Sequence, residues 1–272
     1  MNNYFKWDVD RDILNIFGPF SIRWYSLLFI AGILVGNYIF VRFAKREHKP
    51  FMLCESLLYY IVIGTVVGAR LGHCLFYDPI GYLSNPLTIL KIWEGGLASH
   101  GGYAGVLAAV YLFSRKHPEM SFFWIGDRIG IVSILAGAFI RLGNFFNSEI
   151  VGRVTDVRWA VIFAKVDNYP RHPTQIYEAI GYALISLVLY LCYRFTRMAN
   201  APGRLLGLAC VLAFTFRAFI EYFKENQVPF ETNLPFNMGQ ILSIPFILVG
   251  IMLVLGIQNS KNSHEGHSRS FV

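Results

Sequence analysis

Several ionisable side chains lie within or at the ends of apolar runs of the sequence, among them His100, Arg141, Glu178, Arg217 and Glu221. A charged group at membrane depth costs several kcal/mol, so an apolar segment that keeps one is a candidate functional site. Arginine stays charged in a dry environment and offers a two-pronged donor for phosphate. Histidine takes up or releases a proton near neutral pH. These residue types favour phosphate binding and proton transfer.

The segment 141–152, R-L-G-N-F-F-N-S-E-I-V-G, gathers several polar side chains. Arg141 and Asn144 are three residues apart and share one face of a helix, and Asn147 and Glu149 follow where that helix should end. A guanidinium with amides beside it can hold a phosphate group. The alternative is a capped helix end at the membrane interface, because Asn and Gly are ordinary helix-stop residues.

His100 lies in the glycine-rich segment 95–105, G-G-L-A-S-H-G-G-Y-A-G. The glycines either allow helices to approach closely or leave backbone amides free to bind an anion. A histidine at this place could act as a base, but a lone histidine is more often a satisfied core residue. Both interpretations stay open on the residues alone.

Other charged pairs have a structural alternative. Arg217 and Glu221 are one helical turn apart, so an intramembrane ion pair would satisfy both. Asp127 and Arg128 lie near the end of an apolar run, where snorkelling or local pairing explains them.

The segment 172–178, H-P-T-Q-I-Y-E, begins another apolar run. Pro173 suits the first turn of a helix, and Gln175 and Glu178 would share one helical face. A structural role is enough to explain this segment.

Helices that cross a membrane must position these side chains. The chain of 272 residues is 55% hydrophobic and 15% charged, with a mean hydropathy of +0.46, which is outside the usage of soluble proteins. Its apolar runs have about the twenty residues that a spanning helix needs. We expect an all-α integral membrane protein with about seven transmembrane helices, at residues 24–43, 53–76, 97–113, 122–146, 174–193, 205–223 and 238–257.

Basic residues between the apolar runs predict the orientation. The first connection is the densest, with Arg42, Lys45, Arg46 and Lys49, and the third and fifth connections are basic too. By the positive-inside rule these face the cytoplasm, which leaves the N-terminus outside and the C-terminus in the cytoplasm. The bias is modest, because the fourth connection, which would lie outside, also carries basic residues.

One transmembrane catalytic domain is expected over residues 1–257. Within it, residues 146–173 form a small extracytoplasmic insert with a strand-like run at 159–166. The amphipathic segment 13–20 predicts an interfacial arm. Residues 258–272 form a polar cytoplasmic tail that we expect to be disordered.

The composition also argues against several classes of protein. The net charge is +7, but no basic stripe alternates with aromatics, so no nucleic-acid partner is expected. The four cysteines have no C-x-x-C spacing and suit small core residues. No His–Glu–His cluster at ligand spacing predicts a metal site.

Six motifs of the chain resemble the prolipoprotein diacylglyceryl transferases. They are R-W-Y (23–25), H-G-G (100–102), R-L-G-N-F-F-N-S-E (141–149), H-P-T-Q-I-Y-E (172–178), F-R-A-F-I-E (216–221) and M-G-Q-I-L-S-I-P (238–245). They run in order over about residues 18 to 255, and the 141–149 motif is the most specific. The chain departs from the family pattern at Phe146 and Ser148, where the family often has Ile and Gly, and around His100, at Ala98, Ser99 and Tyr103. None of these departures removes a polar group.

The resemblance implies a fold and a reaction. The fold would have seven helices in the bacterial cytoplasmic (inner) membrane. The donor would be phosphatidylglycerol and the acceptor the lipobox cysteine of a prelipoprotein, giving a thioether and glycerol phosphate. No cofactor is implied.

The resemblance also implies roles for particular residues. His100 would take the thiol proton or position the headgroup, and Arg141 and Arg217 would bind the phosphate. Asn144 would hydrogen-bond the headgroup, and Glu149 would hold Arg141 or the glycerol. Tyr25, Gly152 and Glu221 would bind substrate or build the scaffold. We expect the His100, Arg141 and Arg217 side chains to converge on one polar cavity open to the outer leaflet.

Three other classes compete with this interpretation. A transporter or channel would use the buried charges as an ion path, but no internal repeat is visible. An intramembrane serine protease lacks a G-x-S-x-G motif, and Ser99 beside His100 in sequence does not make an attacking pair. A purely structural membrane subunit leaves His100, Arg141 and Arg217 together unexplained.

Overall fold

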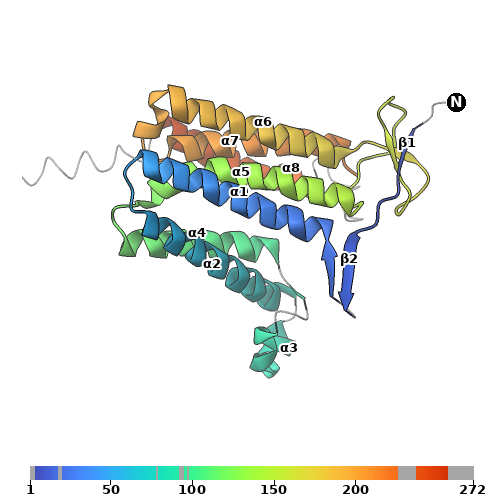
Figure 1. The fold of residues 1–272 in the computed structure, drawn as a ribbon, viewed down its shortest axis with the longest axis horizontal. Coiled ribbons are helices and arrows are strands. Elements are labelled where there is room, and N and C mark those ends of the chain that lie inside the picture. Colours follow the sequence, from blue (N-terminus) through green and yellow to red (C-terminus); the bar gives the residue numbers. More distant parts are fainter. Residues whose placement is uncertain are drawn as a thin grey trace, which may run out of the picture. The chain divides into compact units, whose positions relative to one another are not determined.

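The computed structural model describes residues 4–17, 20–77, 79–91, 95–96, 98–225 and 237–256. Among these residues, six helices are long and apolar enough to cross a membrane. They are α1 (Trp24–Arg46), α2 (Phe51–Tyr77), α5 (Phe122–Phe146), α6 (Thr174–Phe195), α7 (Arg204–Ile220) with its continuation η4 (Glu221–Phe223), and α8 (Met238–Leu255) (Figure 1). The predicted class of an all-α membrane protein is confirmed.

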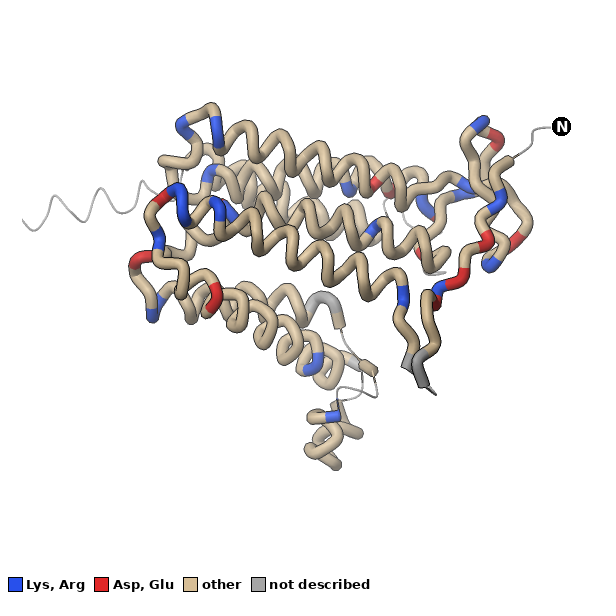
Figure 2. Tube along the Cα trace, in the orientation of Figure 1, with Lys and Arg blue, Asp and Glu red and all other residues tan. Residues whose placement is uncertain are grey.

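The helix boundaries follow from the length of the apolar runs. The expected starts at Trp24, Phe122, Thr174 and Met238 agree with the structure. Charged residues lie mainly near helix ends, as Figure 2 shows by colour. The expected span at 97–113 corresponds to α4 (Ser99–Lys116), a helix of 18 residues that is not among the six. The count of seven spans therefore stays a prediction.

The chain divides into two compact units. The first comprises residues 1–39 and 127–272, and the second comprises residues 40–126. A single catalytic domain over residues 1–257 stays a prediction.

In the first unit, α5 contacts three other helices. Gly32 of α1 faces Ala136 of α5, where an added Cβ would meet the Ala136 Cα at 3.3 Å. The Ser186 hydroxyl of α6 donates a hydrogen bond of 3.0 Å to the Ile131 carbonyl of α5. An added Cβ on Gly130 of α5 would lie 3.2 Å from the Cβ of Ala209 in α7. Small residues thus allow α1 and α7 to pack closely on α5.

Helices α7 and α8 also cross at a pair of glycines. A Cβ on Gly207 would lie 2.7 Å from the Gly250 carbonyl oxygen, and the reverse distance is also 2.7 Å. Helix α8 begins with a capping box, in which the Asn237 side chain accepts from the Gln240 amide and the Gln240 side chain accepts from the Asn237 amide. The cap satisfies two amides that the helix itself leaves unpaired.

The first unit also carries short strands outside its helices. β1 (Phe5–Trp7) pairs in parallel with β4 (Val161–Phe163), which pairs with β5 (Pro170–Arg171). β4 lies inside the predicted strand-like run 159–166. The segment expected to form an interfacial arm forms an antiparallel hairpin of β2 (Asp12–Phe17) and β3 (Phe20–Arg23).

In the second unit, α2 packs on α4 through a row of glycines. A Cβ on Gly68 would lie 2.3 Å from the Gly101 carbonyl oxygen, and one on Gly64 would lie 2.7 Å from the Gly105 carbonyl oxygen. Of the two roles left open for the glycine-rich segment, the structure shows close helix packing for Gly101 and Gly105.

Two short elements, α3 (Pro79–Ser84) and η1 (Pro86–Leu90), follow α2. The buried Arg70 guanidinium donates hydrogen bonds to the carbonyl oxygens of Thr88, Ile89 and Gly95. It therefore holds the described part of the connection between η1 and α4.

Candidate functional site

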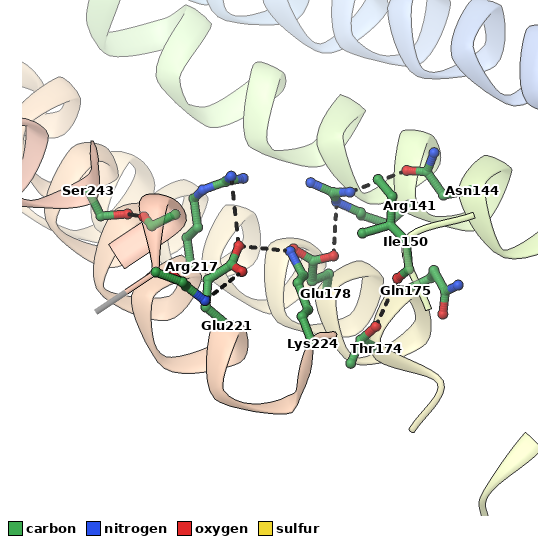
Figure 3. A network of polar contacts seen from close by, with 12 residues as sticks. Arg141, Asn144, Ile150, Thr174, Gln175, Glu178, Arg217, Glu221, Lys224 and Ser243 are labelled. Atoms are coloured by element: carbon green, nitrogen blue, oxygen red, sulfur yellow. Dashed lines mark hydrogen bonds and ion pairs between the residues drawn. The ribbon is translucent and has the colours of Figure 1, made fainter. Parts of the chain in front are cut away.

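Five charged side chains in the first unit form one connected network (Figure 3). Its members are Arg141 of α5, Glu178 of α6, Arg217 of α7, Glu221 of η4, and Lys224, which follows η4. Each contact joins a cation to a carboxylate, so the charges alternate along the network. Such an arrangement satisfies ions in a region where water is scarce.

Arg141 starts the network. Its Nε lies 3.1 Å from Glu178 Oε2 in an ion pair whose geometry is not that of a hydrogen bond. Its Nη1 donates to Asn144 Oδ1 at 3.3 Å, as expected for two residues on one helical face. The Arg141 side chain keeps 15% of its surface exposed, whereas Glu178 is fully buried. Part of the Arg141 side chain is therefore accessible, whereas its carboxylate partner is not.

Lys224 is the centre of the network. Its Nζ donates to Glu178 Oε1 at 2.9 Å and to Glu221 Oε1 at 3.1 Å. The side chain is 2% exposed. One buried ammonium thus connects carboxylates that come from α6 and η4.

Arg217 ends the network. Its Nη2 lies 3.8 Å from Glu221 Oε1, so the intramembrane pair considered from the spacing is present. This pair is not isolated, because Glu221 also contacts Lys224. The Oε2 atom of Glu221 accepts a hydrogen bond of 3.2 Å from the Asn237 side chain. Gly239 leaves room for this carboxylate, since an added Cβ would lie 2.6 Å from its Cδ. The Arg217 side chain is 35% exposed, the most accessible of the five.

The turn after α5 positions Glu149. Asn144 and Asn147 donate to its carboxylate oxygens at 3.3 and 3.2 Å. The Gln175 amide donates to its backbone carbonyl at 2.6 Å. The carboxylate paired with Arg141 is Glu178, and Glu149 reaches Arg141 only through Asn144.

Gly152 allows two backbone segments to meet. Its amide donates to the His172 carbonyl at 3.1 Å, and it forms a β-bridge with Lys224. A Cβ at this position would lie 2.5 Å from the His172 carbonyl oxygen and 2.8 Å from that of Phe223. The absence of a side chain at Gly152 therefore allows the backbone segment that carries Lys224 to approach closely.

Tyr25 packs against α5, where a Cβ on Gly143 would lie 2.9 Å from the tyrosine ring. Gly143 lies between Arg141 and Asn144 in sequence. Tyr25 thus contacts the helix that carries the start of the network.

Arg171 ties residues 146–173 to the segment that carries Lys224. It is buried and bonds the Gly152 carbonyl at 3.0 Å and the Glu225 carboxylate at 2.8 Å. It also pairs with Asp167, and this hydrogen-bonded guanidinium lowers the pKa of the Asp167 carboxyl. Arg153 adds a bond of 2.8 Å from its Nε to the Lys224 carbonyl.

The five side chains comprise three cations and two carboxylates, a sum of +1, and a further carboxylate, Glu149, is joined to Arg141 through Asn144. In Figure 3 the guanidinium groups of Arg141 and Arg217 point toward one another on the same side of Glu178 and Glu221. Tyr182 lies within electrostatic reach of both arginines. Two partly exposed arginine side chains whose guanidinium groups point toward one another suit an anionic group such as a phosphodiester. Among the described residues, no group of three or more His, Cys, Asp or Glu side chains is placed to hold a metal ion.

His100 belongs to the second unit, and its side chain lies outside the described residues. The structure brings Arg141, Asn144, Glu149, Arg217 and Glu221 into connected contacts. The convergence of His100 with the two arginines stays a prediction.

The sequence analysis missed the site roles of Glu178 and Lys224. The sequence marks Glu178 as an ionisable group in an apolar run and on a helix face, but it does not indicate its pairing with Arg141 and Lys224. Lys224 had a usable signal, because it follows Glu221 by three residues, a spacing that places two side chains on one face of a helix.

Comparisons with known proteins agree with one another. The family model for prolipoprotein diacylglyceryl transferase matches residues 11–256. A phosphatidylglycerol–prolipoprotein diacylglyceryl transferase of Tolumonas auensis is 49% identical over 92% of this chain and 96% of its own length. The proteins of the same name from Chloroherpeton thalassium and Bacteroides fragilis are 46% and 42% identical, over 93% and 96% of this chain and 94% and 99% of their own lengths.

Proposed function

The chain belongs to the prolipoprotein diacylglyceryl transferase family, and from this premise we propose that it transfers the diacylglyceryl group of phosphatidylglycerol to the lipobox cysteine of a prelipoprotein. The observation that carries the proposal is the pair of partly exposed arginine side chains, Arg141 and Arg217, whose guanidinium groups point toward one another on one charged network. The headgroup of phosphatidylglycerol contains one phosphodiester with one negative charge, which guanidinium groups can bind.

The site must stabilise the phosphate more strongly in the transition state than in the bound substrate. The cysteine sulfur forms a bond to the terminal glycerol carbon of the diacylglyceryl group while the bond from that carbon to the phosphate oxygen breaks. The electron pair of the broken bond leaves with glycerol phosphate, so negative charge grows on the phosphate in the transition state. Arg141 and Arg217 are fixed donors that stabilise this growing charge more than the ground state, which accelerates the step.

The thiol must also lose its proton, because a cysteine of ordinary pKa near 8.5 is mostly protonated at neutral pH. We assign this proton to His100, because histidine is the side chain whose ordinary pKa lies near neutral pH. General base catalysis of this kind contributes about 10²- to 10⁴-fold. The assignment rests on the family motif around residues 100–102.

The protein is a multi-pass membrane protein of bacteria. We place it in the cytoplasmic membrane with the N-terminus outside, on the strength of basic connections such as Lys45–Arg46 and Arg115–Lys116. This orientation puts the 146–173 insert on the outer side, where a translocated prelipoprotein arrives.

The experiment combines the purified protein, labelled phosphatidylglycerol and a synthetic lipobox peptide. Mass spectrometry should detect the peptide carrying one diacylglyceryl group, together with released glycerol phosphate. A peptide with serine in place of cysteine is the control and should give no thioether. Absence of product from folded protein with the cysteine peptide would refute the activity, and ion flux in proteoliposomes would then support a transport function.

A further inference from the structure

Lys224 lies outside the six sequence motifs and is not one of the residues assigned to bind the phosphate. It lies between two carboxylates, is 2% exposed, and keeps its Nζ 2.9 Å from Glu178 and 3.1 Å from Glu221. A buried lysine is rare unless it is paired, and here it is paired twice. Such a group must change what the two carboxylates do to their other partners.

The other partners are the two arginines of the site. Glu178 contacts Arg141, and Glu221 contacts Arg217. Without the Lys224 ammonium, Glu178 would pair with Arg141 alone and Glu221 with Arg217 alone. These four charges would sum to zero. With it, each carboxylate shares its charge between two cations, and the network keeps one positive charge.

We propose that Lys224 is the positioning residue that keeps the charge of Arg141 and Arg217 available for the donor headgroup, by drawing Glu178 and Glu221 toward itself. This inference rests on the proposed function, because it concerns the same phosphate site. Lys224 does not touch the lipid. It adds one positive charge to the Arg141–Glu178 and Arg217–Glu221 pairs.

The backbone around Lys224 supports a positioning role. Its carbonyl accepts a hydrogen bond of 2.8 Å from Arg153, and its own residue forms a β-bridge with Gly152. The preceding carbonyl, of Phe223, accepts a bond of 2.9 Å from the Arg153 amide. The extracytoplasmic insert thus fixes the segment from which the lysine reaches into the network.

The test uses charge compensation. Lys224→Met removes the ammonium but keeps a long side chain, and the network then has a net charge of zero. The double variant Lys224→Met/Glu178→Gln removes one carboxylate as well and returns the net charge to +1. Lys224→Arg keeps the charge. Lys116→Met removes a positive charge from an exposed position at the end of α4 and is the matched control.

The readouts are KM for phosphatidylglycerol, KM for the lipobox peptide, and kcat, with thermal unfolding measured for every variant. In Lys224→Met, KM for the lipid should rise about ten- to hundredfold, the range that loss of a charge-assisted contact produces. KM for the peptide should stay near the wild-type value. The double variant and Lys224→Arg should recover most of the lipid KM, and Lys116→Met should match the wild type.

A lipid KM unchanged in folded Lys224→Met, or a double variant no better than the single one, overturns the proposal. If Lys224→Met does not fold, the double variant decides, because it lacks the second carboxylate that would need a partner. In that case, a KM of the double variant for phosphatidylglycerol near the wild-type value supports the proposal, and a raised KM overturns it. A wild-type protein without transfer activity refutes the proposed function instead, and binding of short-chain phosphatidylglycerol to the same variants still tests Lys224.

Discussion

The carboxylate of Asp127 accepts a hydrogen bond of 2.9 Å from the backbone amide of Gly203, which is 76 residues further along the chain. Its other oxygen accepts a bond of 2.8 Å from the Leu206 amide. Gly203 is the N-cap of α7 and has no side chain to satisfy the first amides of the helix. Asp127 of α5 therefore caps α7 from a neighbouring helix, and its negative charge lies at the positive end of that helix.

We predict that Asp127→Ala destabilises the protein by about 2 kcal/mol, because the amides of the N-cap Gly203 and of Leu206 lose their acceptor. Asp127→Asn keeps one acceptor oxygen and should cost less. Equilibrium unfolding in mixed detergent micelles measures both. Equal stability of the alanine variant and the wild type would show that the cap contributes nothing.

The close crossing of α2 and α4 gives a second prediction. Gly68→Ala places a methyl group 2.3 Å from the Gly101 carbonyl oxygen, so the helices must separate. We expect a loss of about 1–3 kcal/mol, typical of overpacking. In Gly36→Ala the new methyl group has its nearest neighbour at 3.6 Å, so this control should keep the wild-type stability or gain slightly. The same unfolding measurement compares the two variants, and equal values would contradict the crossing.

The sequence predicted the helices well because apolar length is a local property. It did not predict that β1 pairs with β4, since Phe5 and Val161 are far apart in the chain and each strand has only three residues. The same limit applied to the site. Arg141 with Asn144 was found because a helix places them together, whereas the contact between Lys224 and Glu178 depends on how α6 and η4 pack.

The turn that holds Glu149 contains strain that can be removed. Ser148 has a φ of 55°, in the left-handed region that favours glycine. Its buried hydroxyl has no hydrogen-bond partner among the described residues. Ser148→Gly should therefore stabilise the protein by about 1 kcal/mol.

Two controls separate the causes at this turn. Ser148→Ala removes only the hydroxyl, so it should gain less than Ser148→Gly. Ser133→Gly, inside α5, should destabilise by about 0.5–1 kcal/mol, because glycine is unfavourable in a helix interior. A loss of stability in Ser148→Gly would contradict the strain.

Stability should also depend on pH through His172. Burial lowers the pKa of His172 below its ordinary value of 6.5. The folded protein therefore holds this side chain neutral while the unfolded chain binds a proton below pH 6.5. The contribution of His172 to the free energy of unfolding is fully present above pH 6.5. It decreases as the pH falls below 6.5, until the pH reaches the pKa of His172 in the folded protein.

Unfolding measured at pH 7.5 and between pH 6.5 and 5 tests this effect. His172→Gln should show a smaller loss of stability on acidification than the wild type. An identical pH dependence in the two proteins would assign the effect to other groups.

Arg141 and Arg217 should form one anion-binding site for the donor lipid. The direct measurement is calorimetric binding of short-chain phosphatidylglycerol to the wild type, Arg141→Gln, Arg217→Gln and the double variant in a zwitterionic detergent. Arg197→Gln, at an exposed position between α6 and α7, is the control. We predict an affinity about ten- to hundredfold weaker for each single variant, no measurable binding for the double variant, and wild-type binding for the control. Wild-type affinity in a folded double variant would contradict the account.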